Sequence, residues 1–181
     1  MTTCLALFRG INVGGHHTVS MGDLKGLHEF LGLTHVVTYI NSGNVVFSSE
    51  IVDRAQLTRQ LEEGFVAKFG FHSTVILRTA PELDAIVANN PFQDQPEKAS
   101  NLVIVMLLAA APTLEAVEDL HKAHAGPEEM HLVGRELYVY YPNGSGRSKL
   151  TNSLIEKRLK TVGTGRNWNT LLQLQKMLAQ P

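Results

Sequence analysis

Cysteine is almost absent from this chain of 181 residues, because Cys4 is its single example. One cysteine forms no internal disulfide, which excludes a disulfide-stabilised secreted scaffold and predicts a reducing, cytoplasmic location. No apolar run approaches the roughly 20 residues of a membrane-spanning helix, and the N-terminus lacks the basic flank and cleavage signal of a secretory peptide. We therefore expect no membrane partner.

Familiar catalytic and metal-binding motifs are missing as well. The sequence contains no CxxC, HExxH or GxxxxGK[ST] pattern, and Ser42 is not framed by a GxSxG elbow. Glu118, His121 and His124 repeat at helical spacing, but they supply too few ligands for a metal, so a solvated helix face is expected. We predict no metal and no cofactor. The motifs name neither a nucleophile nor a base, so enzymatic activity stays uncertain.

The charge of the chain is nearly balanced but unevenly distributed. Sixteen basic residues oppose 17 acidic ones, while apolar residues make up 44%, enough for a substantial core. Residues 135–181 hold eight Lys or Arg against two acids, whereas residues 1–134 hold eight against fifteen. This segregation predicts a basic face near the C-terminal end. Solvated basic helix faces are the alternative explanation.

The first half of the sequence predicts a βαββαβ order. Strand-like runs cover residues 3–9, 35–40, 45–48 and 73–78. Ser20 and Asp53 are suited to cap two intervening helices, and the turn Asn-Ser-Gly-Asn at 41–44 has hairpin composition. The order is that of a ferredoxin-like unit.

The second half predicts βαββα followed by a C-terminal helix. A strand is expected at 102–108, a helix at 113–124, a hairpin around Gly134 and Arg135, and helices at 148–159 and 167–178. The fold class is therefore α+β, an α/β sandwich of two ferredoxin-like subdomains. We place the first subdomain at 1–79, a short helix and linker at 80–100, and the second subdomain with the C-terminal helices at 101–181.

A glycine-rich turn between the last predicted strand and the helix expected to begin at Ser148 is the primary candidate site. Glycines let backbone amides converge, a helix N-terminus attracts anions, and arginine suits bidentate phosphate contact. The candidate phosphate ligands here are Asn143, Gly144, Ser145, Gly146, Arg147, Ser148 and Lys149. The alternative is a tight turn in which Ser148 is an ordinary helix cap and the cations are solvated.

A second turn, at residues 164–170, adds Arg166, Asn167 and Trp168 to the candidates. Asn167 is suited to cap the final helix, which places Arg166 beside another helix N-terminus. Trp168 offers a stacking face for a base, although a core tryptophan is the favoured interpretation. We expect the two turns to converge on one pocket.

Secondary candidates are Arg9, Asn12, Gly14 and Gly15, in the loop after the first strand, and Tyr140, a stacking candidate on a later strand. In a ferredoxin-like unit we expect the Arg9 loop and the hairpin at 41–44 to lie at opposite ends of the sheet.

Three segments together resemble a bacterial family known as domain of unknown function 1697. They are residues 8–15 (FRGINVGG), residues 39–47 (YINSGNVVF), and the stretch from 141–144 (YPNG) to 166–170 (RNWNT). The resemblance implies two ferredoxin-like subdomains and no established activity, substrate or cofactor. His16 and His17 depart from it, because Lys or Asn is expected at that loop position, which weakens the case for permanent positive charge there.

Three functions follow as hypotheses. The first is binding of a phosphate-bearing ligand, nucleotide or RNA, at the basic C-terminal face. The second is an enzyme acting on a small anionic substrate between the two subdomains. The third is a non-catalytic, homodimeric interaction protein that pairs through a sheet edge.

Overall fold

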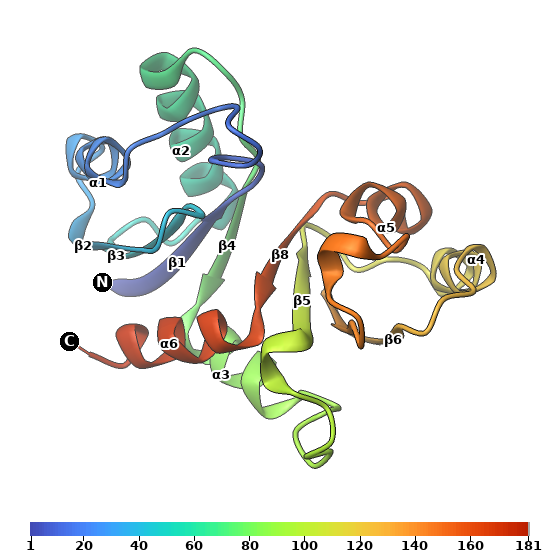
Figure 1. Cartoon of the computed structure of the whole chain (residues 1–181). Helices are drawn as coiled ribbons and strands as arrows, with labels where there is room; N and C mark the ends of the chain where they lie inside the picture. Colours follow the sequence, from blue (N-terminus) through green and yellow to red (C-terminus); the bar gives the residue numbers. More distant parts are fainter. Residues whose placement is uncertain (181) are drawn as a thin grey trace. The chain divides into compact units, whose positions relative to one another are not determined.

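A computed structural model describes residues 1–180, which fall into two compact units. The first unit comprises Met1–Asp84 and the chain from Leu174 onward, and the second comprises residues 85–173. Each unit contains one four-stranded antiparallel sheet (Figure 1). The chain is therefore an α+β protein, as the sequence predicted. The subdomain boundaries at 79/80 and 100/101 stay a prediction.

The first unit follows the βαββαβ order. Its elements are β1 (Thr2–Phe8), α1 (Met21–Phe30), β2 (Thr34–Tyr39), β3 (Asn44–Ser49), α2 (Arg54–Phe69) and β4 (Val75–Thr79), after which α3 (Ala80–Ala88) begins. The sheet order is β2-β3-β1-β4, with β1 antiparallel to both of its neighbours. This is the ferredoxin-like arrangement.

The helices of the first unit begin and end where local chemistry requires it. Ser20 Oγ accepts a hydrogen bond from the Asp23 amide at 3.0 Å, and Asp53 Oδ1 accepts one from the Ala55 amide at 2.9 Å. Gly70 ends α2 in the left-handed conformation, with φ of 79°. Both predicted caps are thereby confirmed.

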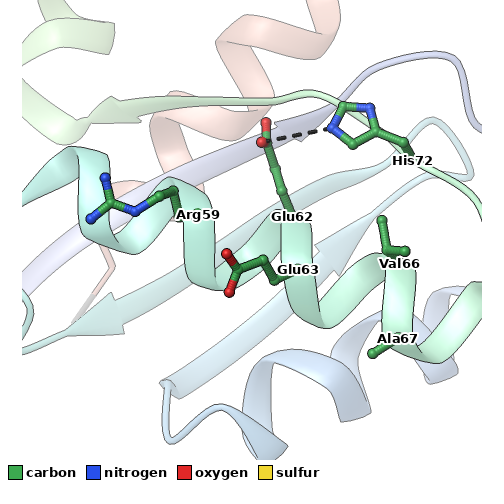
Figure 2. A pocket seen from close by; sticks show the side chains of 6 residues that line it. All are labelled: Arg59, Glu62, Glu63, Val66, Ala67 and His72. Atoms are coloured by element: carbon green, nitrogen blue, oxygen red, sulfur yellow. Dashed lines mark ion pairs between the residues drawn. The ribbon is translucent and has the colours of Figure 1, made fainter.

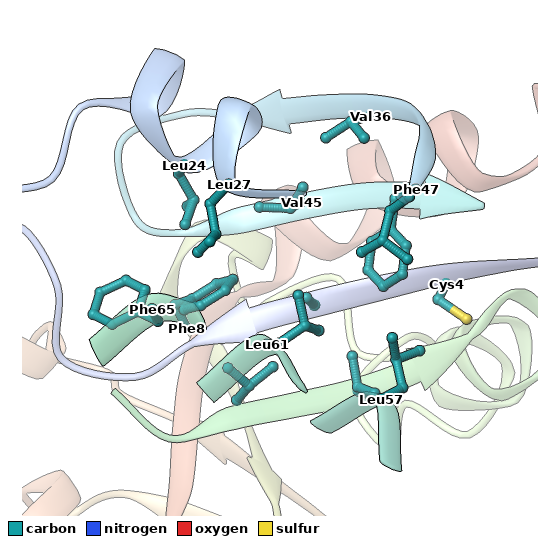
Figure 3. Close-up of a cluster of buried hydrophobic side chains, with 14 of the residues drawn as sticks. Cys4, Phe8, Leu24, Leu27, Val36, Val45, Phe47, Leu57, Leu61 and Phe65 are labelled. Atoms are coloured by element: carbon teal, nitrogen blue, oxygen red, sulfur yellow. The ribbon is translucent and has the colours of Figure 1, made fainter. Parts of the chain in front are cut away.

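The first core lies between the sheet and helices α1 and α2 (Figure 3). Alternate residues of β1 face the helices, so Cys4 and Phe8 contact the core while their neighbours face away. The helices contribute the buried side chains Leu24, Leu27, Leu57, Leu61 and Phe65. Burial raises the pKa of the Cys4 thiol, which disfavours the reactive thiolate.

The second unit repeats the same sheet order, as β6-β7-β5-β8. Its elements are the short helix η1 (Ser100–Leu102), β5 (Val103–Leu108), α4 (Leu114–Ala123), β6 (Glu129–Val133), β7 (Glu136–Tyr140), η2 (Ser145–Arg147), α5 (Asn152–Leu159) and β8 (Gly163–Asn167), followed by α6 (Trp168–Leu178). Met106, Leu137, Val139, Ile155 and Leu159 form its core.

Strand β8 was not predicted from the sequence. Its residues, Gly-Thr-Gly-Arg-Asn, have low strand propensity because two are glycine. The strand forms because Gly163 pairs with Leu108 and Gly165 with Met106 on the central strand β5. A Cβ atom at Gly163 would lie 2.9 Å from the Leu107 carbonyl oxygen, so this close approach requires glycine.

Helix α5 begins later than predicted. Ser148 does not cap it, because Thr151 is the N-cap and its Oγ1 accepts from the Leu154 amide at 3.2 Å. The Ser148 hydroxyl instead donates to Glu128 and accepts from the Leu150 amide at 3.0 Å. The glycine turn therefore enters a one-turn 3₁₀ helix and an extended segment rather than the N-terminus of α5.

The Arg9 loop and the hairpin at 41–44 lie at the same end of the sheet, so the expectation of opposite ends was wrong. Because β1 and β3 are antiparallel, the last residue of one strand meets the first residue of the other. The Phe8 amide donates to the Gly43 carbonyl at 2.9 Å, and Asn12 Nδ2 donates to the Asn41 carbonyl at 2.7 Å. The two segments are therefore hydrogen-bonded to each other at this end of the sheet.

Candidate functional site

A cleft of about 520 Å³ in the second unit joins two loops that are distant in sequence. One segment, residues 123–128, runs from the last residue of α4 to the start of β6, and the other, residues 143–149, lies in the connection between β7 and α5. The second loop contributes Asn143, Gly144, Arg147, Ser148 and Lys149 to the cleft lining. Five of the predicted ligand residues are thus brought together.

Arg147 and Lys149 are the exposed cations of this cleft. Within residues 1–180 neither side chain forms an ion pair with a carboxylate. By contrast, the nearby Arg158 pairs with Asp119 at 3.2 Å. The positive charge of Arg147 and Lys149 is therefore available to a bound anion.

The floor of the cleft holds a buried polar relay that joins the two loops. Ser148 Oγ donates to Glu128 Oε1, and Glu128 Oε2 lies 2.7 Å from His124 Nε2. The side chains of His124 and Glu128 are only 5% and 7% exposed. Each carboxylate oxygen thus has its own partner, which satisfies the charge in its buried position.

Hydrogen bonding keeps Glu128 ionised. Burial by itself raises the pKa of this carboxyl, but the hydrogen bonds from Ser148, its own amide and His124 outweigh that effect and bring the pKa below its ordinary value. Gly126 leaves room for the pair, because a Cβ there would lie 2.3 Å from Glu128 Oε2 and 2.8 Å from His124 Nε2. The loop backbone is packed directly against the relay.

The remaining residues of the glycine turn lie beside the cleft. Ser145 lines a neighbouring hollow of about 400 Å³, together with Thr151 and Asn167. Asn167 Oδ1 accepts from the Asn169 amide at 3.0 Å, which confirms that it caps the last helix. Gly146 is exposed on the same turn.

The structure does not bring Arg166 and Trp168 to the cleft. Side chains alternate along β8, so Arg166 points to the opposite face of the sheet from Gly165 and Asn167, which line the neighbouring hollow. Arg166 is buried, its Nη1 donates to Thr164 Oγ1 at 2.7 Å, and burial lowers its pKa to about 10. Trp168 is buried at the start of α6. The two turns therefore meet only at the hollow that Ser145 and Asn167 line, and the expectation that their guanidinium groups share a pocket was wrong.

The secondary candidates in the loop after β1 lie outside the cleft, and the Asn12 side chain is already hydrogen-bonded within that loop. Asn12 clamps its own loop, since Oδ1 accepts from the Val19 amide at 2.7 Å and Nδ2 donates to the Val19 carbonyl at 2.9 Å. Arg9, Gly14 and Gly15 are exposed on the same loop of the first unit.

The Tyr140 ring contacts another part of the second unit. It lies against Phe92, with ring centroids 6.1 Å apart, and Lys98 Nζ lies 5.4 Å from its centroid. Its contacts thus favour a packing role.

Sequence reasoning missed His124, Gly126 and Glu128. The pattern placed His124 on a solvated helix face, whereas the residue ends α4 in an extended conformation, with φ of −118°. This backbone turn directs the imidazole toward Glu128 rather than toward its neighbours on the helix. No spacing rule for helices or strands predicts a contact made by an irregular loop.

Figure 2 shows a second hollow, of about 440 Å³, over α2 in the first unit. Both carboxylate oxygens of Glu62 already have partners there: Oε1 accepts a hydrogen bond from the Val75 amide at 2.9 Å, and Oε2 lies 3.8 Å from His72 Nε2. This hollow lacks a concentration of charge of one sign, because Arg59 lies among Glu62 and Glu63. In the described residues no group of three or more His, Cys, Asp or Glu is placed to hold a metal.

Two repeated four-stranded sheets with the same strand order define a tandem ferredoxin-like α+β protein. The family described as "Protein of unknown function (DUF1697)" matches residues 1–138, and the chain belongs to that family. The predicted resemblance is thereby confirmed. The matched segment includes His124 and Glu128 and ends before the glycine turn.

The fold is shared with a solved bacterial structure. The conserved bacterial protein SP0830 from Streptococcus pneumoniae is 24% identical, with a TM-score of 0.75, and the match covers 98% of each chain. A likeness at this identity shows the fold alone. Comparison with curated proteins finds no match. Among residues 1–180 no helix combines the length and apolarity needed to cross a membrane.

Proposed function

We propose that the cleft between residues 123–128 and 143–149 binds a small phosphate-bearing ligand. The observation that carries this proposal is the asymmetry of the charges in the cleft. Among the described residues Arg147 and Lys149 have no carboxylate partner and are exposed, whereas Glu128 already has hydrogen-bond partners. The guanidinium of Arg147 suits bidentate contact with phosphate oxygens, and Lys149 adds a point charge.

The size of the cleft favours a nucleotide or a similar small molecule over a nucleic-acid strand. Small-molecule sites typically enclose about 300–1,000 Å³, and this cleft measures about 520 Å³. RNA binding instead relies on a long basic track or on exposed stacking platforms. Trp168 is buried, and Tyr140 is engaged by Phe92 and Lys98.

Calorimetric titration with inorganic phosphate and with a nucleoside monophosphate tests the proposal. The double variant Arg147→Ala and Lys149→Ala should lose affinity by at least about tenfold, because two charge-assisted contacts disappear. The control removes two exposed cations outside the cleft, Lys157 and Lys176, as Lys157→Ala with Lys176→Ala. It should bind as the wild type does.

Three outcomes would refute this assignment. Unchanged affinity in the cleft variant removes the site, and an equal loss in the control variant shows a general charge effect. Tighter binding of a short RNA, with a salt dependence that reports several phosphates, moves the assignment from a small ligand to RNA. An enzyme acting between the subdomains and a homodimer paired through a sheet edge stay predictions.

A further inference from the structure

The relay in the cleft has the connectivity of an activated nucleophile. The Ser148 hydroxyl donates a hydrogen bond to Glu128 Oε1, and the other carboxylate oxygen of Glu128 contacts His124. A hydroxyl bonded to a base that a third group orients is the arrangement that activates serine in covalent catalysis. Ser148 is half-buried and lines the cleft, so a small ligand bound there would lie beside it.

We propose that Ser148 is a nucleophile toward phosphate esters, with Glu128 as its base and His124 as the residue that positions Glu128. The substrate class rests on the function proposed above, because Arg147 and Lys149 flank Ser148 in the same cleft. The relay itself does not depend on those cations.

The transfer balances without a metal or a redox partner. Ser148 Oγ forms a bond to phosphorus while the phosphorus–oxygen bond to the leaving alcohol breaks. The serine proton passes to Glu128 and then to the departing oxygen. In the second half water forms a bond to phosphorus and the Oγ–phosphorus bond breaks. The water proton returns through Glu128 to Oγ, which releases phosphate and restores the hydroxyl.

The surroundings of Ser148 stabilise charge on both partners. The Leu150 amide donates to Ser148 Oγ at 3.0 Å, which favours negative charge on that oxygen. Arg147 and Lys149 are placed to offset the charge of the transferring phosphoryl group. The carboxylate is ionised, and its Oε1 already accepts the hydrogen bond of the Ser148 hydroxyl, so the proton acceptor is in place before the reaction.

The competing explanation is that Ser148 and Glu128 form a structural link between the two loops. Both explanations predict a loss of stability when either residue is replaced, so stability alone does not separate them. Reactivity does, because a structural hydroxyl is no more nucleophilic than any other serine. Ser145, exposed on the same turn and without a contact to Glu128, is a built-in comparison.

Diisopropyl fluorophosphate is the probe, with peptide mass spectrometry to locate the adduct in the full chain. In this reaction the Oγ–phosphorus bond forms, the phosphorus–fluorine bond breaks, fluoride leaves and the proton passes to Glu128. Ser148 should be labelled at least about tenfold faster than Ser145, and Glu128→Gln should slow the reaction by a similar factor.

The pH dependence of labelling is the second readout. The wild-type labelling rate should fall in acid as Glu128 is protonated. The labelling rate of the Glu128→Gln variant should not fall in acid. The His124→Gln variant should be labelled more slowly than the wild type, and its rate should still fall in acid.

The wild-type comparison of Ser148 with Ser145 needs no variant, so it remains decisive even if a variant misfolds. The proposal is overturned if Ser148 is not labelled, if Ser145 reacts as fast, or if Glu128→Gln reacts at the wild-type rate. The probe is uncharged, so labelling of Ser148 in the wild type does not require binding of a phosphate anion, which the calorimetric titration measures separately. A failure of phosphate binding is thereby distinguished from a failure of the nucleophile.

Discussion

Acid should destabilise the first unit through His28, which is fully buried in its core. Its Nδ1 lies 2.8 Å from the Leu24 carbonyl oxygen, so this nitrogen carries the proton of the neutral ring. In the part of the chain that the structure describes, Nε2 is buried without a hydrogen-bond partner. The ring packs against Phe8 and Phe47, with centroids 5.6 and 5.4 Å away. A second proton on Nε2 would therefore be an unsolvated charge.

The size of this destabilisation follows from the pKa of His28. Burial, only partly opposed by the hydrogen bond to Leu24, lowers the pKa of His28 from 6.5 to about 4. Between these two pKa values the His28 imidazole is therefore protonated in the unfolded state and neutral in the folded state. The free energy of unfolding is unaffected above about pH 6.5, falls as pH decreases toward 4, and is lower by about 3 kcal/mol once the decrease is complete. At pH 5 the loss is about 2 kcal/mol.

Urea denaturation of the wild type and of His28→Leu measures this effect, with circular dichroism for the whole chain and hydrogen exchange of β1 and α1 peptides for the first unit. Between pH 7.5 and 5 the wild type should lose about 2 kcal/mol more than His28→Leu. Replacing the exposed His16, as His16→Leu, should leave the wild-type pH dependence in place. Parallel pH profiles for the wild type and His28→Leu would refute the reasoning.

Two further predictions concern the first unit. Glu82 accepts from Arg54 at 2.9 and 2.8 Å and from the Thr79 amide at 2.8 Å. These contacts outweigh the effect of burial and lower the pKa of Glu82 to about 2. Glu82→Gln should therefore cost about 1 kcal/mol at pH 7, measured by urea denaturation, and this difference should shrink as pH falls from 4.5 toward 2. Ile40 adopts a φ of 47° and is half-exposed, so Ile40→Asn should relieve about 1 kcal/mol of backbone strain and thereby raise the melting temperature. A lower melting temperature would show that the packing of Ile40 outweighs the strain.

The sequence by itself determined the elements whose causes are local. Apolar runs and capping residues such as Ser20 and Asp53 placed the strands and helices of the first unit, because a cap acts within three residues of itself. The repeated βαββ order was sufficient to predict a ferredoxin-like sheet twice. The glycine turn was also visible, since the glycines and cations that form it are consecutive.

Only the tertiary structure decided which distant residues each of these segments contacts. Strand β8 exists because β5 offers it hydrogen bonds, and it turns Arg166 away from the hollow that Gly165 lines. The partner of Ser148 is Glu128, twenty positions earlier in the chain. A contact over that distance depends on where two loops leave their sheet, which no local spacing encodes. The candidate chemistry of this protein therefore resides in loop contacts, whereas its fold resides in periodicity and caps.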